Sequence, residues 1–522
     1  MVSFLNGFLG NNEFKLKPGR LSMLKRVSKK TDNKEKTKTE TAAELRVHNN
    51  LEKNLLQLKE IMGNCPDILI RDYKAGADEK VACAVVTMDG MSDQLLITEG
   101  IFKPFHKESD LTPANAFLKI KDSVMSIAEV KESEDSSKLV DSLLSGDTII
   151  FIDGHSAALI VGTGKIPSRS VSEPIIEPVI RGPRDGFTEV LKVNMALIRR
   201  RIRSPRLQTE SFAIGNLSKN AVMIAYIKGV ADEKVVAELR RRLKKIEIDL
   251  VLESGYIEEL IKDSPLSPFY TIGRTERPDK VAALLVEGKV AILTDNTPFV
   301  LTVPYLFLES LQANEDFYEN FYIGTFLRWI RMLCLVALLT LPSIYVAVST
   351  FHPDLIPTPL LLTIAAAREN IPFPAFIEIL LLEISFEVVR EVGVRLPRPI
   401  GSAISIVGGL IMGDAAVKAG YISPSVVIIV AFTALSSYAI PGYTTNLTLR
   451  VLRFPLLILS AFLGLYGLLL GLIVILIHLV SLRSFGVPYL TPVAPWNTYK
   501  SKEIFFRIPW WAKDANPKQS EE

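Results

Sequence analysis

The chain has 522 residues, with 60 lysine or arginine against 57 aspartate or glutamate, so its formal net charge at pH 7 is only +3. A balance this close to neutral points to no particular charged partner, and three widely spaced cysteines exclude a disulfide framework or a clustered zinc site. Charge is dense up to about Arg331 and sparse from there to Arg483. This distribution predicts a water-soluble part followed by a membrane part.

The first 50 residues are predicted to form a disordered basic arm. They hold eleven lysine or arginine residues against five aspartate or glutamate residues, with few apolar side chains to offset the entropy of ordering. A solvated or lipid-facing tail is the favoured interpretation, and nucleic acid binding is the alternative. The N-terminus lacks the features of a secretory signal, and the cysteine usage favours a reducing compartment, so the soluble part is expected in the cytoplasm.

Residues 51–170 are predicted to form one α/β subdomain. Alternating apolar side chains predict strands at 67–73 and 81–90, and the same pattern is expected to continue through 95–105. Residues 147–162 are predicted to form two short strands around a turn.

Residues 171–310 are predicted to hold a proline-rich connector and a second α/β subdomain. A helix is expected from Phe187 onward, with Asp185 as its N-terminal cap. A strand at 221–230 and a helix at 232–247 follow, and residues 287–289 (EGK) are a candidate hairpin turn.

The fold class predicted from these patterns is an α+β soluble region with two α/β subdomains, followed by an α-helical multi-pass membrane domain over 311–485 and a cytoplasmic tail over 486–522. Four membrane spans are predicted from uncharged or glycine-rich blocks, because such blocks suit about 30 Å of hydrocarbon. The blocks are 332–353, 399–413, 419–449 and 454–482.

Within the glycine-rich block, Gly409 and Gly413 have the four-residue spacing that lets helices approach closely. Arg328 and Arg331 precede the first span and indicate a cytoplasmic N-terminal half. Sites where spans are able to bend are Pro342, Pro424, Pro441 and the Gly408–Gly409 pair.

The motifs that resemble enzyme sites do not fit their chemistry, so the chain is predicted to be no enzyme and to need no cofactor or metal. Ser156, next to His155, lacks the strand-to-helix turn of a nucleophile elbow. The stretch 161–165 (VGTGK) lacks the glycine spacing of a phosphate loop. The basic run 199–203 has no aromatic neighbours for nucleic acid, and capping a helix end or packing against acidic groups is favoured.

A fifth membrane element of unsettled depth is the segment 376–401, which carries four carboxylates in apolar surroundings. Glu383, Glu387 and Glu391 follow one another at i, i+4 spacing and share one stripe, whereas Glu378 falls roughly opposite Glu387. An unpaired charge in hydrocarbon costs at least a few kcal/mol, so this stripe requires an explanation.

Two explanations remain open from the residues alone. Arg390, Arg395 and Arg398 are candidate local partners on a helix at the membrane surface, with Glu391 and Arg395 ideally spaced. Alternatively, the stripe faces water inside an oligomer and lines a path for cations. One helix cannot enclose a pore, so the second explanation requires several subunits.

Four long stretches, in this order, resemble the A subunit of the GerA-type spore germinant receptors of endospore-forming bacteria. The resemblance covers about residues 60–495. The stretches are RGPRDGFTEVLKVNMALIRRRIRSPRL, HPDLIPTPLLLTIAAARENIPFP, FEVVREVGVRLPRPIG and SLRSFGVPYLTP.

The resemblance implies a multi-pass protein of the spore inner membrane that works with a transporter-like B subunit and a lipoprotein C subunit. It implies that the B subunit senses the nutrient, and that the A subunit forms a homo-oligomer, expected to be a pentamer, that releases monovalent cations. Membrane lipids are expected partners and nucleic acid is not. On this basis Glu383, Glu387 and Glu391 are predicted ion-pathway residues. The alternatives are a membrane scaffold that docks or clusters receptor subunits, or a sporulation-specific paralogue.

Overall fold

The computed structural model describes residues 46–76, 81–107, 111–112, 115–125, 129–165, 173–174, 177–395 and 413–512. The chain divides into two compact units, one of residues 1–63 and 68–165 and the other of 64–67 and 166–522. The predicted basic arm lies almost entirely outside the described residues.

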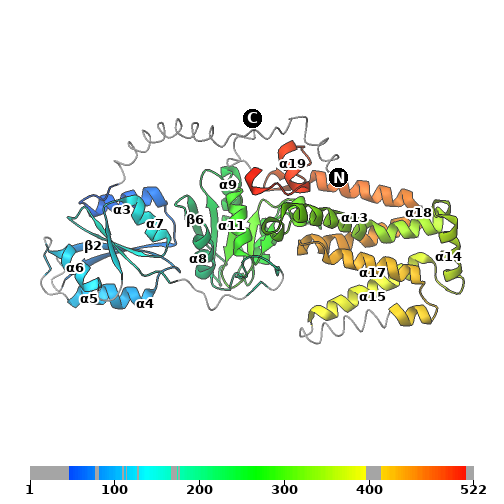
Figure 1. The fold of residues 1–522 in the computed structure, drawn as a ribbon, viewed down its shortest axis with the longest axis horizontal. Coiled ribbons are helices and arrows are strands. Elements are labelled where there is room, and N and C mark those ends of the chain that lie inside the picture. Colours follow the sequence, from blue (N-terminus) through cyan, green and yellow to red (C-terminus); the bar gives the residue numbers. More distant parts are fainter. Residues whose placement is uncertain are drawn as a thin grey trace, which may run out of the picture. The chain divides into compact units, whose positions relative to one another are not determined.

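The first unit is an antiparallel five-stranded sheet with helices on both faces (Figure 1). The strand order is β1-β2-β4-β5-β3, and Val85 is paired with Arg71 on one side and Ile150 on the other. Its elements are α3 (Leu51–Met62), β1 (Ile68–Ala75), β2 (Val81–Met88), α4 (Gln94–Ile97), the π-helical turn η1 (Thr98–Phe102), α5 (Lys103–Lys107), α6 (Ala116–Met125), β3 (Val130–Ser133), α7 (Ser136–Leu144), β4 (Thr148–Ile152) and β5 (Ala158–Val161).

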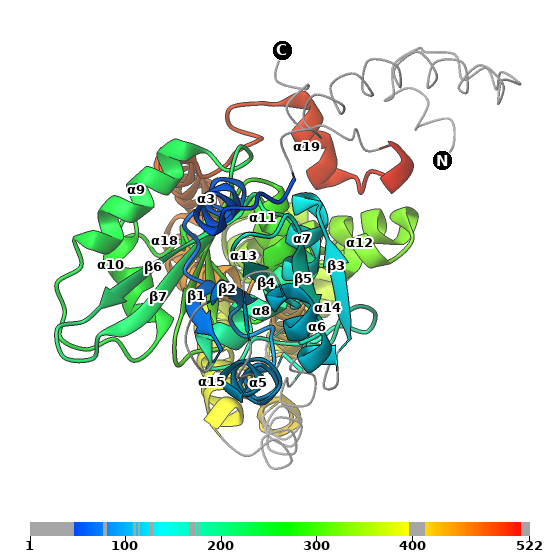
Figure 2. The same ribbon diagram turned by 90° about the vertical axis from the view of Figure 1, so that its left-hand side faces the viewer.

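Both faces of this sheet are covered, which explains why its inner strands are apolar throughout rather than alternating. Cys83 and Val85 pack with α4 to α6, whereas α3 and α7 lie on the opposite face, as Figures 1 and 2 both show. The predicted strands at 67–73, 81–90 and 147–162 are confirmed by β1, β2, β4 and β5.

The expected continuation of strand structure through 95–105 is wrong, because this stretch is helical. The Asp93 side chain accepts hydrogen bonds from the backbone N–H groups of Leu95 and Leu96 and so caps the start of the helix. Ile97, Ile101 and Phe105 recur every four residues and are all buried on one helical face.

The second unit begins with another five-stranded antiparallel sheet, ordered β6-β7-β9-β10-β8. Counted within the unit, this order is the same as in the first sheet, so the two α/β subdomains repeat one topology. The elements are α8 (Leu191–Arg201), β6 (Leu207–Ile214), β7 (Asn220–Ile227), α9 (Glu233–Lys244), α10 (Ser254–Ile261), β8 (Gly273–Thr275), α11 (Pro278–Val286), β9 (Val290–Thr294) and β10 (Val300–Val303).

Helices cover this second sheet as they cover the first. Helices α9 and α10 pack on one face, against residues such as Ile224 and Ile292. Helices α8 and α11 pack on the other, against Ala225 and Leu293 (Figure 2). The predicted fold class of the soluble region is therefore confirmed.

Two local predictions in this subdomain are wrong. Asp185 does not cap the helix, which begins at Leu191. The Leu191 N–H donates instead to Asp295 Oδ1 at 3.0 Å. Residues 287–289 join helix α11 to strand β9 rather than two strands, because Pro278 starts a helix that Gly288, with φ +95°, ends.

The basic run 199–203 is partly internal. The Arg199 guanidinium is 1% exposed and its Nε donates to Asp67 at 2.7 Å, while Thr209 donates to the same carboxylate. Arg201 pairs with Asp185 at 2.5 Å. Packing against acidic neighbours, the favoured interpretation of this run, is confirmed for these two arginines.

An apolar helical region follows the second sheet. Its long elements are α13 (Phe321–Phe351), α14 (Thr358–Arg368), α15 (Ala375–Arg395), α17 (Pro424–Tyr438) and α18 (Tyr443–Ser481). The short ones are η2 (Phe307–Leu311), α12 (Glu315–Tyr318), η3 (Pro353–Leu355), β11 (Arg483–Ser484), β12 (Val487–Pro488), α19 (Thr498–Phe505) and η4 (Trp510–Ala512).

Helix α18 is a hairpin of two arms that turns at Gly464, where φ is 63° and ψ is −144°. A Cβ at Gly467 would collide with the Leu459 carbonyl, and one at Gly471 with the Leu456 side chain. In a straight helix these pairs would lie roughly 12 and 22 Å apart, so the arms must run antiparallel. The arms cover 443–463 and 465–481, about 31 and 26 Å long.

The predicted span blocks therefore need correction. The block 454–482 is not one straight helix, because it bends back at Gly464. The block 419–449 is divided between α17 and α18 by a break at 439–442, where Gly442 packs against Ser310 without room for a side chain. Among the described residues, α13 and α18 are long and apolar enough to cross a membrane by length and composition. The block 399–413 lies outside them except for its last residue.

Buried charges tie the start of α13 to the C-terminal segment. Asp316 is fully buried and accepts from Arg331 at 2.7 Å and from Arg328 at 3.1 Å. The Arg507 Nε donates to the backbone carbonyl of Asp316 at 3.2 Å. Arg328 and Arg331, expected to mark membrane orientation by their charge, thus serve as internal partners of a carboxylate.

The end of α18 is held by the α/β subdomain. His478 lies 2.9 Å from the Ser267 hydroxyl, and the Tyr489 hydroxyl donates to the Tyr270 carbonyl at 2.8 Å. At the other end, the Tyr318 hydroxyl of α12, just before α13, donates to Asp279 of α11 at 2.5 Å. Both the beginning and the end of the apolar region are therefore fixed to the second α/β subdomain.

The stability of this subdomain should depend on pH through Glu258. Burial in α10 raises its pKa from 4.5 to about 7, against the opposing influence of Arg274. Because the pKa of Glu258 is higher in the folded chain than in the unfolded chain, its protonated form stabilises the fold. This contribution to the free energy of unfolding is fully present below about pH 4.5 and is lost as the pH rises past about 7. We expect Glu258→Gln to remove this pH dependence and to raise the thermal midpoint above pH 7. Glu259→Gln, at the exposed neighbour, should keep the wild-type slope; identical profiles for all three proteins would contradict the assignment.

Candidate functional site: paired charges between α15 and α18

The carboxylates Glu383 and Glu387 of helix α15 face the first arm of helix α18. Glu383 is 1% exposed and forms an ion pair with Arg453, which is 2% exposed. Glu387 pairs with Arg450, whose Nε donates to Oε1 at 3.1 Å, and Arg453 donates to the same oxygen at 3.2 Å. Two carboxylates and two guanidinium groups thus form one network, which we call the charge cluster.

The spacing along the two helices explains why these four side chains meet. Glu383 and Glu387 are one turn apart on α15, and Arg450 and Arg453 are about one turn apart on α18. The later carboxylate meets the earlier arginine, so α15 runs antiparallel to the first arm of α18. Each helix presents one charged face to the other.

A third arginine lies beside the charge cluster. Arg390 donates to the Ser437 hydroxyl of α17 at 2.7 Å, and its guanidinium carbon lies 4.8 Å from the ring centre of Tyr438 and 5.3 Å from that of Phe386. Cation–π contacts of this kind stabilise a cation that has little water around it. Arg390 is therefore held by α17 and by a ring on its own helix, and not by the carboxylates it was expected to pair with.

The other two carboxylates of α15 have different surroundings. Glu391 is exposed and pairs with Arg395 at 2.6 Å on the same helix, as the surface interpretation predicted. Glu378 is fully buried, lies 3.3 Å from the Arg368 Nε, and accepts from the Ser423 N–H at the start of α17 at 2.8 Å. The stripe of Glu383, Glu387 and Glu391 therefore has a buried, paired part and an exposed part.

The predicted packing glycines are only partly described. Gly409, like Gly408 and Arg398, lies outside the described residues. A Cβ at Gly413 would lie 3.7 Å from the Val427 side chain, an ordinary contact distance, so helix packing there does not require glycine. Of the predicted bending sites, Pro342 lies inside α13, and Pro441 lies in the break before α18.

Arg450 and Arg453 were not among the site residues predicted from the sequence. Both lie between the uncharged blocks 419–449 and 454–482. Two arginines about one helical turn apart at that junction match the spacing of two carboxylates on the preceding amphipathic segment. That match is the signal from which the pairing was predictable.

The energetic consequence is asymmetric. A carboxylate or a guanidinium that is buried alone costs several kcal/mol, whereas the paired arrangement removes most of that cost without necessarily adding stability over an apolar pair. The charge cluster therefore fixes which faces of α15 and α18 meet. Loss of a single partner should be far more damaging than loss of both.

We expect Glu383→Gln to destabilise the helical region by about 3 kcal/mol, because it leaves Arg453 buried with only part of its countercharge. Thermal unfolding of the detergent-solubilised full chain measures this loss. The control is Glu391→Gln on the same helix, which breaks an exposed i, i+4 pair worth about 0.5 kcal/mol or less. Equal losses in the two variants would show that burial of the cluster has no energetic weight.

The Ser156 and His155 motif, which did not match an enzyme site in sequence, lies in a turn between two strands. Ser156 lies in the turn between β4 and β5, and the stretch after it is a strand, as predicted, instead of the helix that a nucleophile elbow requires. His155 stacks on Phe117 with ring centres 5.3 Å apart. Among the described residues, histidine, cysteine and carboxylate side chains form no group of three suited to hold a metal ion.

Comparison with known proteins gives one consistent family. The chain is 45% identical over 467 residues to spore germination protein KA of Bacillus subtilis (strain 168), covering 90% of this chain and 86% of that protein. It is 45% identical over 470 residues to the membrane protein YfkQ of the same organism, covering 90% and 91%. A crystal structure of the N-terminal domain of the A subunit of the Bacillus megaterium spore germinant receptor GerK3 is 38% identical, covering 50% of this chain and 97% of that chain with a TM-score of 0.41.

Residues 56–519, nearly the whole chain, match the family described as Bacillus/Clostridium GerA spore germination protein. The match includes both α/β subdomains, the charge cluster and the C-terminal segment. The chain therefore belongs to the GerA family of spore germination proteins.

Proposed function

We propose that this chain is the A subunit of a nutrient germinant receptor of the spore inner membrane, where it oligomerises, as a pentamer, into a ligand-gated cation channel. Family membership and a relative named spore germination protein KA support the role in germination. The observation that carries the channel proposal is the position of Glu383 and Glu387, two carboxylates inside an apolar helical region. Carboxylates at such depth are characteristic of ion paths.

In the proposed topology the apolar helices cross the membrane. Helix α13 and the first arm of α18 are long enough to do so at ~1.5 Å per residue, and the second arm, 465–481, is at the short end of the range for membrane spans, about 17 residues. The α/β subdomains and the C-terminal segment then share the cytoplasmic side, because both ends of the apolar region are fixed to the second subdomain.

In the proposed closed state, Arg450 and Arg453 neutralise Glu387 and Glu383, so neither of these two carboxylates is free to attract a cation. Opening requires α15 to move relative to the first arm of α18, which would turn these carboxylates toward water shared by neighbouring subunits. Glu391 is exposed already and extends the same stripe. Monovalent cations then leave the spore core along this stripe.

The proposed partners are a transporter-like B subunit that binds the nutrient and a lipoprotein C subunit. Nutrient binding shifts the closed-to-open equilibrium only if the B subunit binds the nutrient more tightly in the open assembly. The A subunit itself then needs no contact with the nutrient to be opened by it.

Potassium flux through liposomes containing the assembled receptor tests the proposal. We expect germinant-triggered flux from the wild type and a several-fold smaller flux from Glu387→Gln with the assembly intact, because a negative charge on the path is lost. The control is Asp414→Asn, which removes a carboxylate paired with Lys418 in the same apolar region. Absence of flux with all partners and germinant present would refute the channel.

A scaffold that docks or clusters receptor subunits is the second candidate function, and a sporulation-specific paralogue is a variant of it. One observation favours it: Glu383 and Glu387 are both paired with arginine within a single chain, which is also what a purely structural cluster needs. The same flux measurement separates the candidates. A scaffold predicts receptor assembly that depends on this chain, with no flux through it.

A further inference from the structure

A cavity of about 230 Å³ lies where the second α/β subdomain meets the start of α18. Its walls come from strand β8, helix α11, the segment 305–318 and the first residues of α18. We propose that this cavity binds a small organic cation, an ammonium group carried on an apolar body. The proposal concerns a binding site and does not depend on ion conduction.

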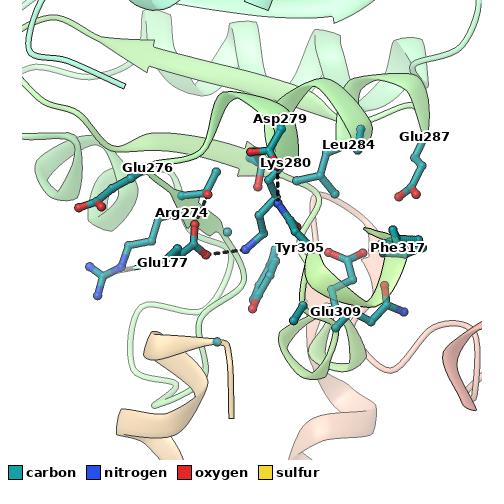
Figure 3. A pocket seen from close by; sticks show the side chains of 18 of the residues that line it. Glu177, Arg274, Glu276, Asp279, Lys280, Leu284, Glu287, Tyr305, Glu309 and Phe317 are labelled. Atoms are coloured by element: carbon teal, nitrogen blue, oxygen red, sulfur yellow. Dashed lines mark hydrogen bonds and ion pairs between the residues drawn. The ribbon is translucent and has the colours of Figure 1, made fainter. Parts of the chain in front are cut away.

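The cavity has two facing walls (Figure 3). Leu284 projects into it from helix α11 and Glu287 from the residue just after this helix, and Tyr305 and Glu309 project from the segment that follows the sheet. Phe317 closes the side next to Glu309. The walls therefore combine carboxylates with aromatic rings.

Carboxylates outnumber cations among the described lining residues. The acidic side chains are Glu177, Glu276, Asp279, Glu287 and Glu309, and the basic ones are Arg274 and Lys280. Such a lining attracts a cation and repels an anion.

Glu177 is already satisfied, because it accepts from Lys280 at 2.7 Å and from the Thr275 hydroxyl. Lys280 therefore offers no unpaired positive charge for an anion. Recognition must then rest on the other carboxylates.

One carboxylate oxygen remains available for a ligand. Asp279 does not supply it, because its Oδ2 accepts from Arg277 at 2.7 Å and Tyr318 at 2.5 Å, and its Oδ1 is buried out of reach of the cavity. Glu309 pairs with Lys289 through Oε2, and its Oε1 has no hydrogen bond within the described part of the chain. An ammonium N–H would donate a charge-assisted hydrogen bond to this oxygen of Glu309.

Aromatic rings supply the remaining requirement for a cationic ligand. Tyr305, Phe317 and Tyr443 all line the cavity, and ammonium groups are attracted to the faces of such rings. The guanidinium carbon of Arg274 lies 5.4 Å from the centre of the Tyr443 ring, so this ring already interacts with a cation. A neutral apolar molecule would fill the space but leave Glu309 Oε1 without a donor.

The position gives the site a structural consequence. Tyr443 is the first residue of α18, and Arg450 of the charge cluster lies about two turns further along the same arm. A ligand in the cavity would therefore contact the helix that holds half of that cluster.

Calorimetric titration of the detergent-solubilised full chain with phenethylammonium chloride tests the proposal. We expect measurable binding to the wild type, and at least about tenfold weaker binding to Glu309→Gln, because a charged acceptor is lost. Phenethyl alcohol, which keeps the shape and removes the charge, should bind at least about tenfold more weakly than the amine for the same reason.

Two further variants distinguish a loss of binding from a loss of folding. Ala283→Trp adds bulk at an exposed lining position and should abolish binding while thermal unfolding stays as in the wild type. Glu247→Gln, at an exposed carboxylate that does not line the cavity, should bind phenethylammonium as the wild type does. No binding to the wild type, equal binding of the amine and the alcohol, or unchanged binding in both Glu309→Gln and Ala283→Trp would each overturn the proposal.

Discussion

The buried ion pair between Glu383 and Arg453 is the constraint on which the helical region depends. Both side chains are almost wholly removed from solvent, in a region whose other side chains are mainly apolar. Neither charge is tolerable there without the other, so the pair decides which face of α15 meets the first arm of α18. Glu387 and Arg450 extend the same contact by one turn. Helix α15, which has four carboxylates in an apolar sequence, is thereby kept next to the arm of α18 that contains Arg450 and Arg453.

Contacts elsewhere in the second unit hold the ends of α13 and α18 in position. The start of α13 is fixed by the buried Asp316 with its two arginines, and the end of α18 is fixed by contacts with residues 267–270. Because α18 turns at Gly464, both of its ends lie on the side of the α/β subdomain. The cavity at the start of α18 lies within this anchored zone. A movement of the subdomain would therefore reach the charge cluster through a continuous helical arm.

Much of the architecture was predictable from the sequence, because strand alternation and the change in charge density are local signals. The failures have specific causes. The helix at 95–105 was mistaken for a strand because its buried positions, four apart, are filled by residues that also suit strands. The hairpin in α18 was missed because apolar composition is the same on both sides of Gly464. The carboxylate stripe was recognised, but the arginine partners of Glu383 and Glu387 lie over 60 residues away in sequence, and periodicity within one helix cannot reveal a partner on another.

The most direct test of the central claim exchanges the two charges. Glu383→Arg and Arg453→Glu should each lower the thermal midpoint of the solubilised chain strongly, because each places two like charges in a buried contact. If this pair fixes the meeting of α15 and α18, the double variant should recover most of the loss. A double variant as unstable as the sum of the two single variants would contradict the account.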